Sequence, residues 1–259
     1  MKWDPAKYVK FDDHRNRPFF DLTGRIHADR PARVVDLGCG PGNLTAALAE
    51  RWPGAQVVGL DSSAEMLAKA APLAQAVPAL RFEHADIAEW MPTGETDVVV
   101  SNAALQWVPG HQDLMRRWLK ALRPGSWFAM QVPGNFNAPS HSLMRELAAS
   151  GRWAARLGGV LRGGESVGEP ADYLGILLDA GCAADAWETS YQQVLQGPDP
   201  VLEWVRGTAL RPVMAVLGDD DARNFEEEYA AALRAAYPQG AHGTVYPFRR
   251  IFAVGRKEE

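Results

Sequence analysis

Short apolar runs alternate with amphipathic stretches over the first half of the chain. Short apolar runs bounded by glycine, proline or acidic residues are typical of strands buried on both faces. The predicted strands are 34–37, 56–60, 80–83, 97–101 and 127–132. The predicted helices cover 44–52, a stretch that starts at Ser62 or Ser63, and 113–122. This alternation indicates βαβ units and a parallel sheet.

The alternation weakens after residue 139. Helices are predicted over 140–157, 171–180, 200–210 and 221–236, and strands over 186–195 and 248–256. The aromatic and basic stretch from Trp3 to Ile26 predicts one or two short helices broken at Pro18. We therefore expect a single domain over 1–259 with a core at about 31–135 and cap elements at about 1–25, 139–180 and 197–243.

Composition narrows the class of protein. The 259 residues are 47% hydrophobic and carry a formal net charge of −5. An acidic chain is a poor default partner for nucleic acid, because that affinity rests on phosphate neutralisation. No apolar run reaches the roughly 18 residues of a membrane span, and the first residues lack a secretory signal. The only cysteines, Cys39 and Cys182, lack metal-ligand spacing, so we expect a cytoplasmic protein without a metal site.

A glycine-rich turn follows the first strand. Its sequence, Val34-Val35-Asp36-Leu37-Gly38-Cys39-Gly40-Pro41-Gly42-Asn43, joins a predicted strand to a predicted helix. Glycines there allow a ligand to approach the backbone at the carboxyl end of the sheet. The spacing differs from the G-x-G-x-x-G of nicotinamide dehydrogenases. Asp36 would repel a diphosphate, whereas a cationic ligand would be attracted to it.

Polar residues follow each of the next three strands. Asp61 can accept both hydroxyls of a ribose, and Asp86 can bond an adenine amino group while Ile87 packs on the ring. Asn102 follows the fourth strand and faces the same crevice. Taken singly, the glycines could form only a tight turn, Asp61 a helix cap, and Asp86 a solvated loop acid. Their occurrence in order after successive strands favours a nucleoside-binding site.

These residues resemble those of class I S-adenosylmethionine-dependent methyltransferases. The resemblance implies an α/β, three-layer Rossmann-like fold with a seven-stranded, mostly parallel sheet, an antiparallel last strand and helical cap elements. It also implies S-adenosylmethionine as cofactor and S-adenosylhomocysteine as product. The expected cofactor-binding residues are Asp36, Gly38, Gly40, Gly42, Asn43, Asp61, Ser62, Met66, Asp86, Ile87, Asn102 and Trp107.

A narrower resemblance extends over nearly the whole chain. The segments 3–5, 101–109, 131–135 and 246–252 are similar to those of trans-aconitate 2-methyltransferases. That family methylates one carboxylate of a small polycarboxylic acid. Two alternatives remain open, namely carboxyl methylation of a malonyl thioester and a non-catalytic S-adenosylmethionine-binding module. Nucleic-acid methylation is disfavoured, because no Pro-Pro-aromatic turn follows the fourth strand.

Methyl transfer to a carboxylate needs no general base, since the acceptor is already ionised at pH 7. We therefore expect no catalytic residue in the narrow sense, and rate acceleration through proximity and orientation. Arginine is suited to binding the acceptor, because its planar fork bonds a carboxylate at two points. Arg249 and Arg250 are adjacent in a predicted strand and must face opposite sides. The expected substrate-binding residues are Tyr8, His14, Arg17, Gln106, Arg206 and Arg249.

Overall fold

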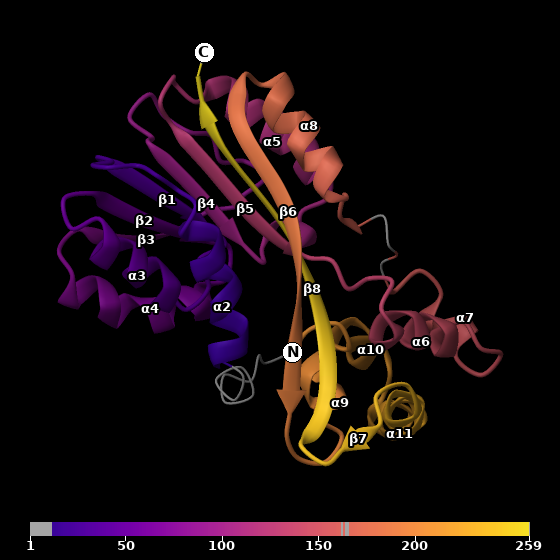
Figure 1. The fold of residues 1–259 in the computed structure, drawn as a ribbon. Helices are drawn as coiled ribbons and strands as arrows, with labels where there is room; N and C mark the ends of the chain where they lie inside the picture. Colours follow the sequence, from indigo (N-terminus) through magenta and orange to yellow (C-terminus); the bar gives the residue numbers. More distant parts are fainter. Residues whose placement is uncertain (1–11, 162, 164–165, 259) are drawn as a thin grey trace. The chain divides into compact units, whose positions relative to one another are not determined.

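The computed structural model describes residues 12–161, 163 and 166–258, and its ribbon is drawn in Figure 1. The chain forms two compact units. The sheet unit comprises Asn16–Pro133, Val167–Glu188 and Ile251–Glu259. The helical unit comprises Met1–Arg15, Gly134–Ser166 and Thr189–Arg250. In the part of the chain that the structure describes, no helix is long and apolar enough to cross a membrane.

The sheet has the strand order β3-β2-β1-β4-β5-β8-β6. Its parallel strands are β1 (Arg33–Leu37), β2 (Gln56–Asp61), β3 (Leu80–His84), β4 (Val98–Asn102) and β5 (Trp127–Pro133). The long strands β6 (Cys182–Leu195) and β8 (Gly243–Lys257) contribute residues to both units. Lys257 N donates to Ser126 O at 2.8 Å, so the end of β8 meets the start of β5 and the two strands are antiparallel. The mostly parallel sheet and its antiparallel strand confirm the predicted fold class. An eighth, two-residue strand, β7 (Gln239–Gly240), pairs with β8.

Helices cover both faces of the sheet unit (Figure 1). One face carries α2 (Asp12–Thr23), α3 (Asn43–Arg51) and α4 (Ala64–Ala76), and the other carries α5 (His111–Ala121) and α8 (Pro170–Asp179). On the second face, Trp118 of α5 and Tyr173 of α8 are fully buried with Phe128 of β5 in one apolar core. The apolar strands predicted from the sequence thus form the middle layer of three.

The helix α2 corrects one expectation, because it runs through Pro18 without a break. A proline inside a helix removes one hydrogen bond and destabilises it by about 3 kcal/mol. Phe19 and Leu22, which follow Pro18 in the same helix, are both buried in the protein core. Burial of two such side chains is worth roughly 3–6 kcal/mol, which offsets the loss at Pro18.

The helical unit corrects the predicted lengths of two other helices. The stretch expected as one helix over 140–157 forms α6 (Pro139–Ala148) and α7 (Ala154–Leu157), separated by a turn around Gly151. The helix expected over 200–210 ends earlier, as α9 (Pro200–Arg206), and a further helix, α10 (Arg211–Val216), follows. The remaining helix, α11 (Asp219–Ala236), packs Phe225 and Tyr229 into a separate apolar core with residues of α6, α7 and α9.

The two units divide the segments that the sequence grouped as a cap. The helix α8 belongs to the sheet unit, and its apolar residues Tyr173, Ile176 and Leu177 join the core beside the sheet. The segments 139–161 and 197–243 belong to the helical unit. Apolar side chains decide this division, because each unit has its own continuous buried core.

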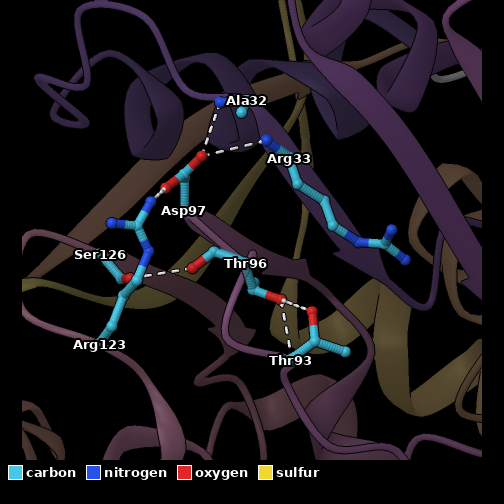
Figure 2. Close-up of polar contacts among 7 residues, drawn as sticks. All are labelled: Ala32, Arg33, Thr93, Thr96, Asp97, Arg123 and Ser126. Carbon is cyan, nitrogen blue, oxygen red and sulfur yellow. Dashed lines mark hydrogen bonds and ion pairs between the residues drawn. The ribbon is translucent and has the colours of Figure 1, made fainter.

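A polar network joins the amino ends of three parallel strands (Figure 2). The Asp97 carboxylate accepts hydrogen bonds from Ala32 N at 2.6 Å and Arg33 N at 3.1 Å, and it forms an ion pair with Arg123. Ser126 Oγ donates to Thr96 O at 2.9 Å. These bonds satisfy backbone groups at the amino ends of the strands. The glycine-rich turn lies at the other edge of the sheet, where the strands have their carboxyl ends.

Candidate active site

The glycine-rich turn after β1 combines two requirements. Gly38 and Gly40 have φ angles of 79° and 56°, which other residues rarely adopt. A Cβ on Gly38 would lie 2.3 Å from Ala104 Cβ, so the turn after β4 packs directly against this glycine. A Cβ on Gly40 would meet no described atom within 4 Å. Gly38 is therefore needed for packing, whereas the Cβ side of Gly40 is open to a ligand.

Asp61, the last residue of β2, fixes the same turn. Its Oδ2 accepts a hydrogen bond from Gly40 N at 2.8 Å, and its Oδ1 accepts one from Ser63 N at 2.8 Å. Ser63 in turn caps α4, because its Oγ accepts from Met66 N at 3.3 Å. Each carboxylate oxygen has a second lone pair. Asp61 thus holds the loop in place and can still accept two hydroxyl groups.

Asp36 lies beneath the turn and is 3% exposed. Its Oδ2 accepts a hydrogen bond from Thr45 Oγ1 at 2.7 Å, at the start of α3. Burial raises the pKa of Asp36 to about 6, against the opposing effect of the Thr45 bond, and repulsion from Asp61 adds to the rise. A cation bound over the turn would favour the ionised form of this carboxylate.

The loop after β3 forms another wall of the site. The Asp86 carboxylate accepts a hydrogen bond from Ala88 N at 2.8 Å, which shapes the turn, and the side chain is exposed. Ile87 is buried, and its Cδ1 would be 3.4 Å from a Cβ placed on Gly38. Ile87 therefore lies close to the glycine-rich turn, and the exposed carboxylate of Asp86 precedes it in the same loop.

The end of β4 supplies the next group. Asn102 Oδ1 is buried and has no hydrogen-bond partner among residues 12–161, 163 and 166–258. The following residue, Ala103, has a φ of 54°, a conformation that costs roughly 1–2 kcal/mol outside glycine. Gln106 Nε2 donates to Ala103 O at 2.6 Å and supports that conformation. Trp107 closes the short 3-10 helix η1 (Leu105–Trp107) and is 50% exposed.

The sheet unit thus brings most of the predicted cofactor residues to one edge. The residues at the ends of β1 to β4 and in the turns that follow them are Asp36, Gly38, Gly40, Gly42, Asp61, Ser62, Asp86, Ile87, Asn102 and Trp107. Asn43 and Met66 lie in the first turns of α3 and α4. No group of three or more potential metal ligands occurs among the residues described.

The predicted substrate residues are distributed over both units. Tyr8 lies outside the described residues. The Arg17 side chain is 68% exposed, and its Nε lies 3.9 Å from Asp21 Oδ2. Both residues and Gln106 belong to the sheet unit. His14 and Arg249 belong to the helical unit. His14 is exposed, and the backbone N–H of Arg249 donates to Asn135 Oδ1 at 2.5 Å.

Arg206 has a different environment from the one expected of a substrate ligand. Its guanidinium forms ion pairs with Glu203 and Glu226 within the helical unit. Because two carboxylates already occupy its donors, Arg206 has a structural role, and we remove it from the proposed acceptor ligands.

Gln131 is a buried polar residue that the sequence-based expectations left without a role. It lies in β5 in register with Asn102 and is fully buried. The signal was present in the sequence, because one amide interrupts an otherwise apolar strand, Trp127-Phe128-Ala129-Met130-Gln131-Val132.

Comparison with known proteins agrees with this geometry. The family model described as a methyltransferase domain matches residues 34–125. The trans-aconitate 2-methyltransferase of Streptomyces avermitilis is 55% identical, over 99% of this chain and 97% of its own length. The enzyme of Rhodococcus jostii is 54% identical, over 98% of this chain and 99% of its own length. That of Mycobacterium tuberculosis is 49% identical, over 97% of this chain and 95% of its own length.

Solved structures share the fold at low sequence identity. The YcgJ protein from Bacillus subtilis superposes with a TM-score of 0.58 at 16% identity, over 95% of this chain and 99% of its own. A phosphoethanolamine N-methyltransferase from Haemonchus contortus, solved with S-adenosyl-L-methionine, gives a TM-score of 0.55 at 17% identity, over 94% of this chain and 53% of its own. The fold is therefore that of methyltransferases, and the near full-length identity to the curated relatives shows that the chain belongs to the trans-aconitate 2-methyltransferase family.

Proposed function

We propose that the protein transfers a methyl group from S-adenosylmethionine to one carboxylate of trans-aconitate and produces the monomethyl ester. The observation that carries this proposal is the identity of 49–56% to trans-aconitate 2-methyltransferases over nearly the whole chain.

The residues at the edge of the sheet fit the cofactor. Gly40 leaves room above the turn, Asp61 retains lone pairs for two ribose hydroxyls, and Ile87 offers an apolar surface for adenine. When bound, the cofactor supplies an electrophilic methyl group on a sulfonium, and a carboxylate oxygen that accepts it yields an ester and neutral S-adenosylhomocysteine. The buried Asp36 carboxylate favours a cationic ligand over the neutral product.

The protein's contribution to the reaction is positioning. The acceptor carboxylate is ionised at pH 7, so no side chain needs to remove a proton. Alignment of the reacting atoms can supply on the order of 7–11 kcal/mol of the barrier. We propose Arg17, Arg249, His14, Gln106 and Tyr8 as ligands of the acceptor, with the arginines bonding its carboxylates. We also propose that the enzyme works in the cytoplasm, where its two free, buried cysteines would stay reduced.

Product analysis tests the proposal. The purified protein would be incubated with isotope-labelled S-adenosylmethionine and, separately, trans-aconitate, cis-aconitate, citrate and a malonyl thioester. We expect labelled monomethyl trans-aconitate as the major ester by mass spectrometry. A labelled malonyl ester in place of it would identify the thioester reaction. Cofactor binding without any ester from the panel would contradict the proposal and favour a non-catalytic binding module.

A further inference from the structure

Two amide side chains, one fully buried and one partly buried, lie next to each other at the carboxyl ends of β5 and β4. Asn102 and Gln131 are register partners in this parallel pair, so their side chains point to the same face of the sheet. Gln131 is 0% exposed. Within the described part of the chain, neither its Oε1 nor its Nε2 has a hydrogen-bond partner, and the same holds for Asn102 Oδ1.

Two serines in or just before these strands do have hydrogen-bond partners. Ser101 Oγ, the residue before Asn102, donates to Leu37 O at 3.0 Å. Ser126 Oγ, just before β5, donates to Thr96 O at 2.9 Å. Buried amides without partners destabilise a fold, and the great majority of buried polar atoms in proteins are paired. Three buried atoms that lack a partner within the described part of the chain therefore indicate the position of a polar ligand at this edge of the sheet.

The strand order indicates which ligand this is. The expected cofactor contacts lie at the ends of β1, β2 and β3, with the ribose acid on β2 and the adenine wall after β3. Successive strands are about 4.8 Å apart. A cofactor whose nucleoside extends from β1 toward β3 directs its other end toward β4. The end of β5, one strand further, then lies beside the acceptor and not beside the nucleoside.

From this placement we infer that Gln131 is a positioning residue for the acceptor, and that its Nε2–H group donates a hydrogen bond to an oxygen of the carboxylate that becomes methylated. The inference rests on the proposed function, because it assumes a carboxylate acceptor. Asn102 Oδ1, which can only accept, is left for a donor such as the cofactor's ammonium group.

A neutral amide is suited to this position. The carboxylate loses its negative charge as its oxygen bonds to the methyl carbon, while the carbon–sulfur bond breaks and its electron pair stays on sulfur. A cationic donor at the reacting carboxylate would stabilise the charged reactant more than the transition state and slow the reaction. An amide orients the oxygen with a weaker bond to the charged form. Arginines are better used on the carboxylates that do not react.

The test compares Gln131→Met, which keeps the volume but removes the amide, with Ser126→Ala, which removes a buried hydrogen bond near the opposite end of the same strand. Acid binding would be measured by calorimetric titration of trans-aconitate into protein saturated with S-adenosylhomocysteine. Cofactor affinity, kcat/KM and thermal unfolding would be measured in parallel. For Gln131→Met we expect acid affinity and kcat/KM to fall at least tenfold, cofactor affinity to change less than twofold, and Tm to stay equal or rise. For Ser126→Ala we expect a lower Tm with unchanged kinetics.

A second variant, Gln131→Glu, adds a pH signature. The carboxyl group that it introduces would repel the acceptor when ionised and donate a hydrogen bond when protonated, so the ratio of variant to wild-type kcat/KM should rise as pH falls. Wild-type acid binding and kinetics in Gln131→Met would overturn the inference, as would an equal loss of cofactor affinity. If the wild-type protein neither binds nor methylates trans-aconitate, the proposed function fails, and the inference fails with it.

Discussion

Asp61 illustrates how one carboxylate can serve both the fold and a ligand. It accepts from Gly40 N and Ser63 N, and two lone pairs remain for ribose hydroxyls. Hydrogen bonds to a charged group contribute about 1.5–3 kcal/mol each. With two such bonds lost, we expect Asp61→Ala to weaken S-adenosylmethionine binding by at least about 100-fold by calorimetry. The control is Glu65→Ala, an exposed acid on the next helix that pairs with Lys69. Unchanged affinity in a folded Asp61→Ala protein would remove Asp61 from the site.

Asp36 predicts a pH dependence of cofactor binding. Its pKa of about 6 lies above the ordinary value near 4, so between these pH values the folded protein binds more protons than the unfolded chain. Stability should therefore fall as pH rises through this window, the reverse of the usual carboxylate behaviour. A cationic cofactor favours the ionised form, so its affinity should rise about tenfold from pH 5 to pH 7.

The comparison variant for this prediction is Asp36→Asn, which can still accept the Thr45 hydrogen bond. Its cofactor affinity should be lower at pH 7 and nearly flat from pH 5 to pH 7 by titration calorimetry. S-adenosylhomocysteine, which lacks the sulfonium, should show a weaker pH dependence than S-adenosylmethionine with the wild-type protein. An equally steep rise in Asp36→Asn would assign the dependence to another group.

At the level of single residues, the sequence revealed chemical type but not partners. Asp61 was expected beside the glycine-rich turn because it follows the second strand, and in the structure its carboxylate accepts from Gly40 N. Arg206 was expected to bind the substrate, and the sequence did not show that Glu226, 20 residues away in the chain, pairs with it. Gln131 was overlooked for the opposite reason, since only the structure shows that its amide is buried beside Asn102 without a bonding partner in the described chain.

Among the elements, the amino ends of the strands offer a prediction about stability alone. Asp97 accepts from Ala32 N and Arg33 N and pairs with Arg123, and so connects β1, β4 and the residues before β5 (Figure 2). We expect Asp97→Ala to destabilise the protein by about 2–3 kcal/mol. For a chain of this size that corresponds to a Tm lower by roughly 4–12 °C. Cofactor affinity of the folded variant should be unchanged in calorimetry, because the site lies at the opposite strand ends. A folded variant with normal Tm would show that this network adds little stability.

The strands were more predictable than the helices for a physical reason. A strand buried on both faces requires a nearly continuous apolar run, and the inner strands β1, β4 and β5 and their neighbour β2 each have one. Three helices of the helical unit, α7, α9 and α10, are short, and α9 ends at its C-cap Gly207. In α2, by contrast, burial of Phe19 and Leu22 overrides the break that Pro18 predicts. Local signals therefore fail mainly where tertiary packing decides.

For the whole molecule, charge sets a condition on the acceptor. The chain carries a net charge of −5, and trans-aconitate brings three carboxylates. Long-range attraction between them is therefore absent, and binding must depend on local cations whose fields act over less than the Debye length of about 8 Å at physiological salt. Removal of one such cation should then have a large effect, while added salt should weaken acid binding only modestly.

Arg249 is the cation that we would test first. It lies in β8 beside Arg250, whose guanidinium is buried and lies 4.3 Å from the centre of the Phe248 ring, so the two arginines serve different environments. If Arg249 binds a carboxylate of the acceptor, Arg249→Ala should raise KM for trans-aconitate about 10–100-fold, the loss of one charge-assisted contact. Cofactor affinity should stay within twofold, because only acceptor binding is lost. Arg249→Lys should recover part of the effect, since an ammonium keeps the charge but not the bidentate geometry.

Arg234→Ala, which removes an exposed arginine paired with Asp199, serves as the control and should leave KM unchanged. Steady-state kinetics would decide: a KM shift common to both alanine variants would reflect a general change in charge, and an unchanged KM in Arg249→Ala would exclude this residue as an acceptor ligand.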